Sequence, residues 1–203
     1  MQKVREIVTN ILKEHAVDTV CFVGCGGSLS GFFPAKYFLS CEAKKLKVGY
    51  INANEFVHAT PKEIGANAVV ILASQRGDTA ETVKACRAAN EKGAATVGLT
   101  FQVPSPLADS AQHVILYEFG DDSIVENQKT SYGFKMALEL LHQIEGYAGY
   151  DAMVKALGSL NEIVVKAKKD IVPFAIKYAW EFKDDSVIYT MGSGPCWGSA
   201  HQE

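Results

Sequence analysis

The stretch "TVCFVGCGGSLSGFF", residues 19–33, indicates the fold most directly. A run of β-favouring apolar residues ends in three glycines between residues 24 and 27, and Ser28 follows at once. When such a turn opens a helix, backbone N–H groups are exposed at the positive end of the helix dipole. Gly26, Gly27 and Ser28 are therefore candidates for binding an anion.

Further apolar runs alternate with helical patterns along the chain. Expected strands occupy residues 19–24, 47–51, 67–74, 95–100 and 113–119. Expected helices occupy residues 28–43, 78–92 and 127–144. Strands separated by helices of about 10–15 residues argue for βαβ units. The sequence therefore predicts an α/β fold, with a parallel sheet flanked by helices, over residues 1–150.

Residues 184–195, "DDSVIYTMGSGP", repeat the design of the first strand and turn. Val20 matches Val187, and Gly27 matches Gly194, at the same spacing. We expect residues 151–203 to hold connecting helices and the truncated start of a second copy of the first domain. Pro173 is expected to kink or split the long helix before this repeat. Apolar surface left uncovered by the missing strands predicts a dimer or larger assembly.

Composition excludes several classes of protein. The 203 residues are 48% hydrophobic with a net charge of −3, so no basic surface predicts a nucleic-acid partner. The charged first helix and the lack of a long apolar run lead us to expect neither a signal peptide nor a membrane span. Five cysteines without a C-x-x-C pair predict reduced thiols and a cytoplasmic location. The five histidines show no metal-ligand spacing, so we expect neither a metal nor a cofactor.

The glycine turn departs from the common nucleotide and hydrolase motifs. In the dinucleotide pattern G-x-G-x-x-G, Leu29 stands at the third glycine, and Asn52 stands where an acid is expected. No Walker A sequence is present, and Ser30 interrupts the hydrolase pattern around Ser28. A nucleotide-binding Rossmann protein is thus a disfavoured alternative.

A second polar turn, "ASQRGDTAET" at residues 73–82, follows the third expected strand. Ser74, Gln75, Arg76 and Thr79 would lie at the strand's carboxyl end, where open α/β sheets bind ligands. Helix capping by Asp78 explains part of the pattern, but not the polar run directly after "AVVILA". Together with the first turn, these groups fit a phosphate held by hydroxyls, backbone amides and an arginine.

The segments "CGGS" (25–28) and "SQRGDTAET" (74–82) resemble the sugar isomerase (SIS) domain, as in the isomerase half of glucosamine-6-phosphate synthase. The resemblance implies a flavodoxin-like three-layer sandwich that binds a sugar phosphate. It implies substrate contacts at Gly26, Gly27, Ser28, Ser74, Gln75, Arg76, Thr79 and Lys129. Arg76 departs from the family pattern, in which a serine is usual. Residues 119–141 are most similar to deglycases of 6-phosphorylated Amadori compounds such as fructoselysine 6-phosphate.

Isomerase or deglycase chemistry needs an acid and a base near C1 and C2 of the sugar. The catalytic residues cannot be assigned here: in the resembling family the glutamate and histidine concerned lie in the second domain, beyond residue 203. We therefore expect an incomplete enzyme, with His201 and Glu203 as a remote catalytic alternative. A one-domain sugar-phosphate isomerase and a non-catalytic sugar-phosphate sensor remain open.

Overall fold

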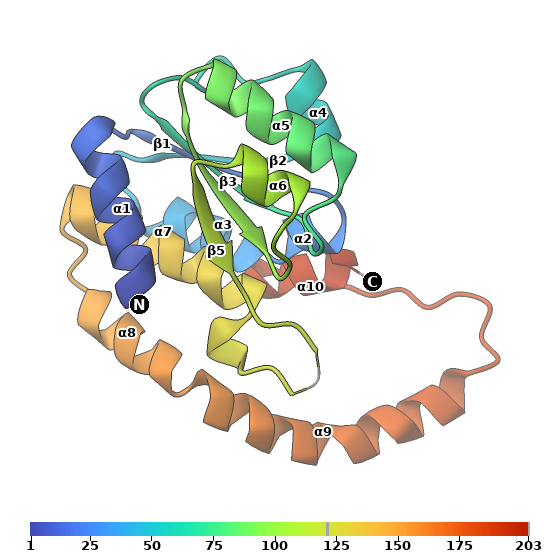
Figure 1. Ribbon diagram of the computed structural model, residues 1–203. Coiled ribbons are helices and arrows are strands. Elements are labelled where there is room, and N and C mark those ends of the chain that lie inside the picture. Colours follow the sequence, from blue (N-terminus) through green and yellow to red (C-terminus); the bar gives the residue numbers. More distant parts are fainter. Residues whose placement is uncertain (121, 203) are drawn as a thin grey trace.

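The computed structural model describes residues 1–120 and 122–202, without the side chains of residues 201 and 202. Five parallel strands form one sheet in the order β2-β1-β3-β4-β5 (Figure 1). The strands are β1 (Thr19–Gly24), β2 (Lys47–Asn52), β3 (Ala68–Ala73), β4 (Ala95–Thr100) and β5 (His113–Leu116). This is the strand order of flavodoxin-like folds. The prediction of an α/β fold with a parallel sheet is confirmed.

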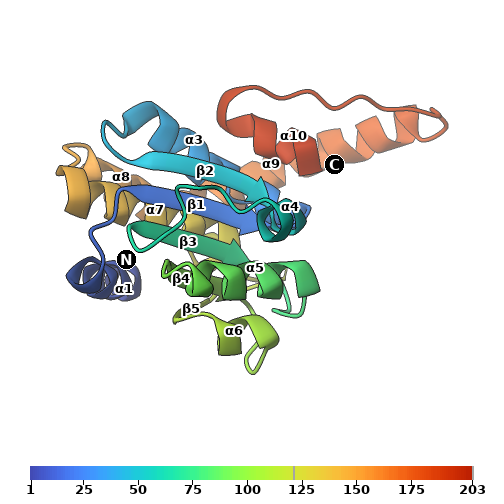
Figure 2. The same ribbon diagram turned by 90° about the horizontal axis from the view of Figure 1, so that it is seen from above.

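Helices cover both faces of the sheet (Figures 1 and 2). One face carries α1 (Gln2–Glu14), α3 (Phe33–Glu42) and α7 (Lys129–Glu145). The opposite face carries α4 (Ala53–His58), α5 (Ala80–Glu91) and α6 (Pro106–Ser110). The result is the three-layer arrangement that the sequence predicted.

The core explains why the central strands are apolar without alternation. Every residue of β1, β3 and β4 is buried, because successive side chains point to opposite faces and both faces are covered. Phe22 belongs to the cluster under α1, α3 and α7, where its ring lies 5.3 Å from that of Phe32. Its neighbour Val23 belongs to the cluster under α4 and α5.

The register of the sheet brings the two polar turns together. Gly24, the last residue of β1, pairs with Ala73, the last residue of β3. The turn after β1 leads into the short helix α2 (Gly27–Ser30), and the turn after β3 leads into α5. Both turns therefore lie side by side at the carboxyl edge of the sheet.

Several expected boundaries differ from the structure. The helix expected over residues 28–43 is divided into α2 and α3, with Gly31 and Phe32 between them. The edge strand β5 stops at Leu116 rather than at residue 119, and the next residues turn toward the site. The short helices α4 and α6 were not predicted, because five or six residues show too little periodicity.

The C-terminal arm, residues 159–202, leaves the body after α8 (Tyr150–Gly158). It contains α9 (Leu160–Phe182), the 3-10 helix η2 (Gly194–Cys196) and α10 (Trp197–Gln202). Helix α9 continues through Pro173, so the proline does not split it, and Figure 1 shows the helix curving along its length. All of α9 is described and none of its residues is buried.

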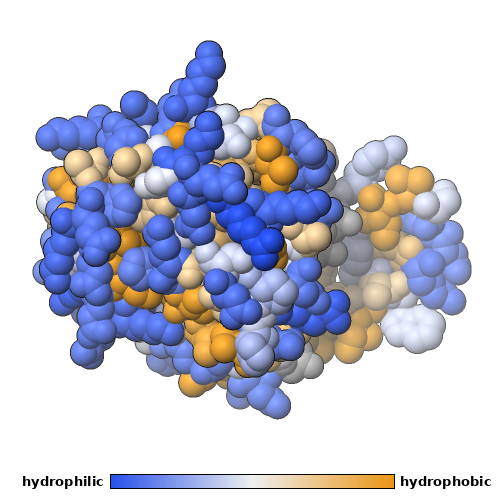
Figure 3. Space-filling model, turned by 45° about the horizontal axis from the view of Figure 1, so that its top comes forward, coloured by the Kyte–Doolittle hydropathy of each residue, from blue (hydrophilic) through white to orange (hydrophobic). Residues whose placement is uncertain are grey.

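The second copy of the first strand is not formed. Residues 186–193 have no regular structure, although they match the sequence of β1. Their apolar side chains are exposed, including Val187, Ile188 and Tyr189. Hydrophobic side chains are visible on the right-hand projection of Figure 3, where the arm lies. A parallel strand requires neighbours for its backbone groups, and this segment has none within the described structure.

Candidate functional site

A cleft of about 590 Å³ opens at the carboxyl edge of the sheet, between the two polar turns. Six of the predicted contacts line it, namely Gly27, Ser28, Gln75, Arg76, Thr79 and Lys129. Cys25, Asp78, Phe101 and Phe119 complete the lining. The site thus gathers residues from the ends of β1, β3, β4 and β5 and from the start of α7.

The first turn depends on the backbone of Gly26, which does not itself line the cleft. Gly26 has a φ of 49°, in the left-handed region that favours glycine, and its carbonyl accepts hydrogen bonds from the N–H groups of Leu29 and Ser30. The following turn of helix places Ser28 at the edge of the cleft. Gly26 therefore shapes the site through the backbone.

Ser74 lies behind the cleft rather than in its lining. Its side chain is 1% exposed, and its Oγ lies 2.8 Å from Thr79 Oγ1. Ser74 Oγ also accepts a hydrogen bond of 3.3 Å from the backbone N–H of Thr79. Thr79 is the N-cap residue of α5, so Ser74 fixes the hydroxyl that faces the cleft at the start of this helix. The N-terminal end of α5 favours a negative charge.

Arg76 brings a positive charge to the rim of the cleft. Its Nε lies 3.3 Å from Asp78 Oδ2, and both side chains are exposed. An exposed ion pair contributes little free energy, so Arg76 can give up its contact with Asp78 for a stronger contact with a dianion. The arginine is thus able to close over a ligand held by the two turns.

Lys129 lies at the inner end of the cleft and bonds across to the first turn. Its Nζ donates a 2.6 Å hydrogen bond to the carbonyl oxygen of Gly27. Burial lowers the pKa of Lys129 from its usual range to about 8. A Cβ at Gly31 would lie 2.6 Å from Lys129 Cε. The absence of a side chain at Gly31 therefore provides the space that the Lys129 side chain occupies. The sequence predicted Lys129 but gave no signal for Gly31.

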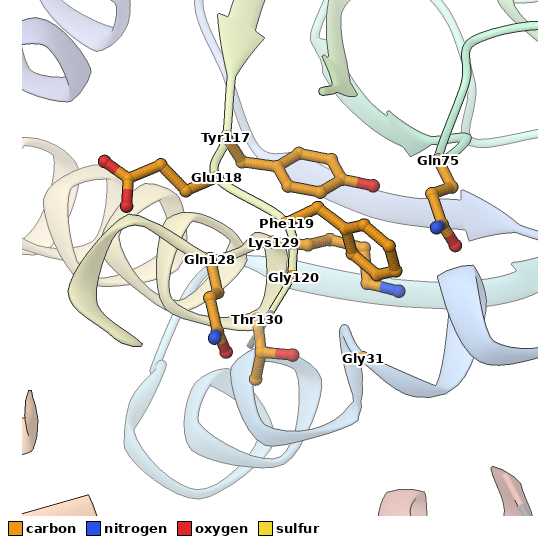
Figure 4. Close-up of a pocket in the computed structure, with 9 residues that line it drawn as sticks. All are labelled: Gly31, Gln75, Tyr117, Glu118, Phe119, Gly120, Gln128, Lys129 and Thr130. Atoms are coloured by element: carbon orange, nitrogen blue, oxygen red, sulfur yellow. The ribbon is translucent and has the colours of Figure 1, made fainter. Parts of the chain in front are cut away.

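A second cavity of about 230 Å³ adjoins the cleft and shares Gln75, Phe119 and Lys129 with it. Figure 4 shows the side chains of these three residues directed toward a common space. The remaining lining comes from Gly31, Tyr117, Glu118, Gly120, Gln128 and Thr130. Burial raises the pKa of Tyr117 to about 12, so its hydroxyl keeps its proton at neutral pH.

Acid–base and metal-binding groups are scarce in the cleft. Asp78 is the one carboxylate among its lining residues, and no histidine is among them in the described part of the chain. A search of the described residues found no group of three or more His, Cys, Asp or Glu that could hold a metal ion. Glu203 and the side chain of His201 lie outside the described residues.

No helix within the described ranges is long and apolar enough to cross a membrane.

Comparison with known proteins assigns the chain to a family. The family model described as "SIS domain" matches residues 15–143. The chain is 37% identical over 192 residues to fructosamine deglycase FrlB of Bacillus subtilis, and the match covers 94% of this chain and 58% of that protein. It is 30% identical to fructoselysine 6-phosphate deglycase of Escherichia coli O157:H7, with 95% and 55% covered.

A solved structure shows the same architecture. The crystal structure of a protein of Salmonella typhimurium LT2 assigned as a phosphosugar isomerase superposes with a TM-score of 0.97 at 51% identity. The match covers 99% of this chain and 61% of that one. The chain therefore spans little more than half the length of the relatives it matches. Its fold, its polar turns and the matched family model together establish that this chain belongs to the SIS domain family.

Proposed function

We propose that this chain binds the phosphate group of a sugar 6-phosphate and belongs to a phosphosugar isomerase or deglycase acting on 6-phosphorylated fructosamines. The observation that carries the proposal is the cleft in which Ser28, Gln75, Arg76, Thr79 and Lys129 meet. The names of the similar proteins, a fructosamine deglycase and a fructoselysine 6-phosphate deglycase, support this choice of substrate.

The phosphate would lie between the first turn and the start of α5. Ser28 and Thr79 offer hydroxyl donors, and α5 offers backbone amides and the positive end of its dipole. Arg76 supplies a charged fork from the rim. Such charge-assisted hydrogen bonds are stronger than neutral ones, so a dianion satisfies this site better than a neutral sugar does.

Binding of the phosphate would orient the sugar for chemistry at C1 and C2. Lys129 and Gln75 line both the cleft and the adjoining cavity, so they would meet the sugar beyond its phosphate. Isomerisation moves a proton between C1 and C2, and a deglycase must also protonate the departing amine. A remote phosphate that holds the sugar in place lowers the barrier for both steps.

We propose that this chain alone binds substrate without turning it over. Asp78 is the single carboxylate lining the described cleft, and it is paired with Arg76 at the rim. Loss of a general acid or base costs about 10²–10⁴-fold in rate. Steady conversion of fructoselysine 6-phosphate by the 203-residue chain would contradict this part of the proposal.

Two threonines at the start of α5, the N-cap residue Thr79 and Thr82 in the first turn, test the phosphate site. Thr79→Val removes the hydroxyl that lines the cleft, and we expect about ten- to a hundredfold weaker binding of glucose 6-phosphate by calorimetry. Thr82→Val is the control, because Thr82 Oγ1 is buried without a hydrogen-bond partner in the described structure and does not line the cleft. Equal affinity of the two variants would refute the assigned site.

We also propose a dimer or larger assembly in the cytoplasm. The apolar face of α9 supports self-association, with Ile171, Phe174 and Trp180 exposed. The five free cysteines support a reducing compartment. Light scattering that gives the monomer mass at every concentration would contradict the assembly.

A further inference from the structure

Two aromatic side chains border the proposed phosphate cleft on the side away from the first turn. Phe101 follows β4 and Phe119 follows β5, and their rings stack with centroids 5.5 Å apart and planes 19° apart. Phe101 also meets the ring of Tyr117 edge-on, with centroids 6.4 Å apart. The three rings form an aromatic wall, defined here as Phe101, Tyr117 and Phe119.

The aromatic wall separates two hollows that lie next to each other. On one side Phe101 and Phe119 line the phosphate cleft. On the other side all three rings line a more open hollow of about 420 Å³. Phe119 is 63% exposed and Phe101 is 37% exposed, so both present ring surface to a ligand. A molecule that extends from the cleft past Phe101 and Phe119 would enter this second hollow.

The aromatic wall is held to the phosphate site by the backbone. The N–H of Phe101 donates a 3.0 Å hydrogen bond to the carbonyl oxygen of Gln75, and the N–H of Tyr117 donates to Thr100 at 3.1 Å. Glu118 secures the following loop, because its carboxylate accepts 2.9 Å hydrogen bonds from the N–H of Ile124 and from Asn127 Nδ2. These bonds tie Phe101 and Tyr117 to the turns that border the cleft.

The outer hollow is acidic. Glu118 and Asp122 line it together with Ser123 and Gly120, and no lysine or arginine is among its described lining residues. The phosphate cleft contains two basic residues, Arg76 and Lys129, and one acidic residue, Asp78, which is paired with Arg76. The two hollows thus present opposite charges, and the exposed aromatic faces between them suit a cation or an apolar chain.

We infer that the aromatic wall and the acidic hollow form the subsite for the amine-derived part of the substrate, and that they favour an amine whose far end is cationic. This inference rests on the proposed function, since it places the amine relative to the bound 6-phosphate. The aliphatic part of the amine packs on Phe119 and Phe101, and the distal ammonium group lies by Asp122. The sugar occupies the space around Gln75 and Lys129.

A series of four synthetic ligands tests the subsite by calorimetry on the full chain. Each is a 6-phosphorylated Amadori compound, made from methylamine, pentylamine, 1,5-diaminopentane or 6-aminohexanoate. We expect the cationic diaminopentane derivative to bind about two- to fivefold tighter than the neutral pentylamine derivative. The methylamine derivative should bind more weakly than both. The derivative with the anionic tail should bind more weakly than the pentylamine derivative.

Three variants assign the preference to residues. Phe119→Ala should abolish the advantage in affinity that the diaminopentane derivative has over the methylamine one. Asp122→Asn should remove the difference in affinity between the ligand with the cationic tail and the ligand with the neutral tail. Phe174→Ala is the matched control, because Phe174 is a similarly exposed phenylalanine on α9 that does not line the cleft or the hollow, and it should leave the affinities for all four ligands unchanged.

Two results would overturn the inference, and they differ from each other. Equal affinity for all four ligands, or a preference for the anionic tail, would remove the subsite while leaving the phosphate site in place. Failure of all four ligands to bind would remove the proposed function together with the subsite.

Discussion

Residues 19–28 and residues 186–195 have matching sequence patterns but different structures. In both, a short helix starts at the same point of the pattern: α2 at Gly27 and η2 at Gly194. Before that point the first segment is strand β1, whereas the second is extended chain without a strand. The helix start is therefore a local property of the turn, and the strand is not.

The difference arises from neighbours. β1 is paired along its whole length with β2 and β3, and Phe22 is fully buried. The matching residue of the second segment, Tyr189, is 86% exposed. Since a strand's stability comes from its ladder and its buried faces, the same apolar run stays irregular when both are missing.

The second turn also lacks the chemistry of the first. Pro195 stands where Ser28 provides a hydroxyl group. Instead of opening a cleft, the second turn leads into α10, where the ring of Trp197 lies 4.5 Å from that of Phe33 on α3. A Cβ at Gly198 would lie 2.6 Å from Phe33 Cβ, so this helix approaches the body closely.

The largest expected contrast is in stability. Phe22→Ala should lower the free energy of unfolding by about 3–5 kcal/mol, because it leaves a cavity in the core. Tyr189→Ala, at the matching place, should change it by less than about 0.5 kcal/mol. Urea denaturation followed by circular dichroism measures both. Equal losses would mean that the second segment is structured as a strand in solution.

The next contrast is in ligand binding. Ser28→Ala should weaken the binding of glucose 6-phosphate by about ten- to a hundredfold, since it removes a hydrogen bond to the charged phosphate group. Ser193→Ala in the second turn should leave the affinity unchanged, because Ser193 does not line the cleft. Calorimetry under identical conditions measures the affinity of both variants for glucose 6-phosphate. A loss of affinity in Ser193→Ala would mean that part of the binding site lies on the arm.

A smaller effect concerns pH and Lys129, the lysine of α7 that is hydrogen-bonded to the first turn. Lys129 has a pKa near 8 because it is buried, so its charge is lost as the pH rises through that value. A sugar phosphate is already a dianion there, since its second pKa is about 6. Affinity for glucose 6-phosphate should thus fall above pH 8, by up to about tenfold per pH unit.

Lys129→Met provides the control for this pH dependence. The variant should bind more weakly at pH 7 and show a flat profile between pH 7 and pH 9. In the wild type, the phosphate raises the pKa of Lys129, so binding near pH 8 should take up protons. Calorimetry in buffers of different ionisation enthalpy measures that proton uptake. If no protons are taken up, Lys129 does not interact with the bound phosphate.

The smallest effect concerns the arm. Trp197→Ala removes the ring contact with Phe33, which contributes about 1 kcal/mol for an aromatic pair. We expect proteolysis of residues 183–193 to become about fivefold faster, with the thermal midpoint of the body unchanged. Cleavage at the wild-type rate would show that the arm is held by contacts other than this pair.

The fold was predictable from the sequence because its signals are local. The expected strand at residues 95–100 is β4, and the one at residues 19–24 is β1. Both are continuous apolar runs between polar turns, as buried parallel strands require. Residues 186–191 form no strand although their sequence resembles that of β1, because a sequence pattern records how well residues suit a sheet and not whether neighbouring strands exist.

Most of the predicted site residues come from the two polar turns, in which neighbouring residues act together. Gln75, Arg76 and Thr79 come from a single polar run, and the structure places them in one cleft. The pairing of Gly31 with Lys129 joins distant parts of the chain, so no local pattern shows it. The stacking of Phe101 on Phe119 likewise needs β4 and β5 to be neighbours. The position of Ser74 behind Thr79 depends on side-chain rotation, which the sequence does not specify.

The arm contacts the body near its start, where Asn161 Oδ1 accepts a hydrogen bond from the N–H of Val125, and near its end, where Trp197 meets Phe33, while no residue of α9 is buried. Amide hydrogens of such a segment exchange with solvent through local opening, whereas those of β1 and β3 exchange only when the whole sheet unfolds. We therefore expect the two parts of this chain to open as separate cooperative units. Deuterium would enter α9 early and β3 last, and a ligand bound in the cleft would delay exchange in the sheet much more than in the arm.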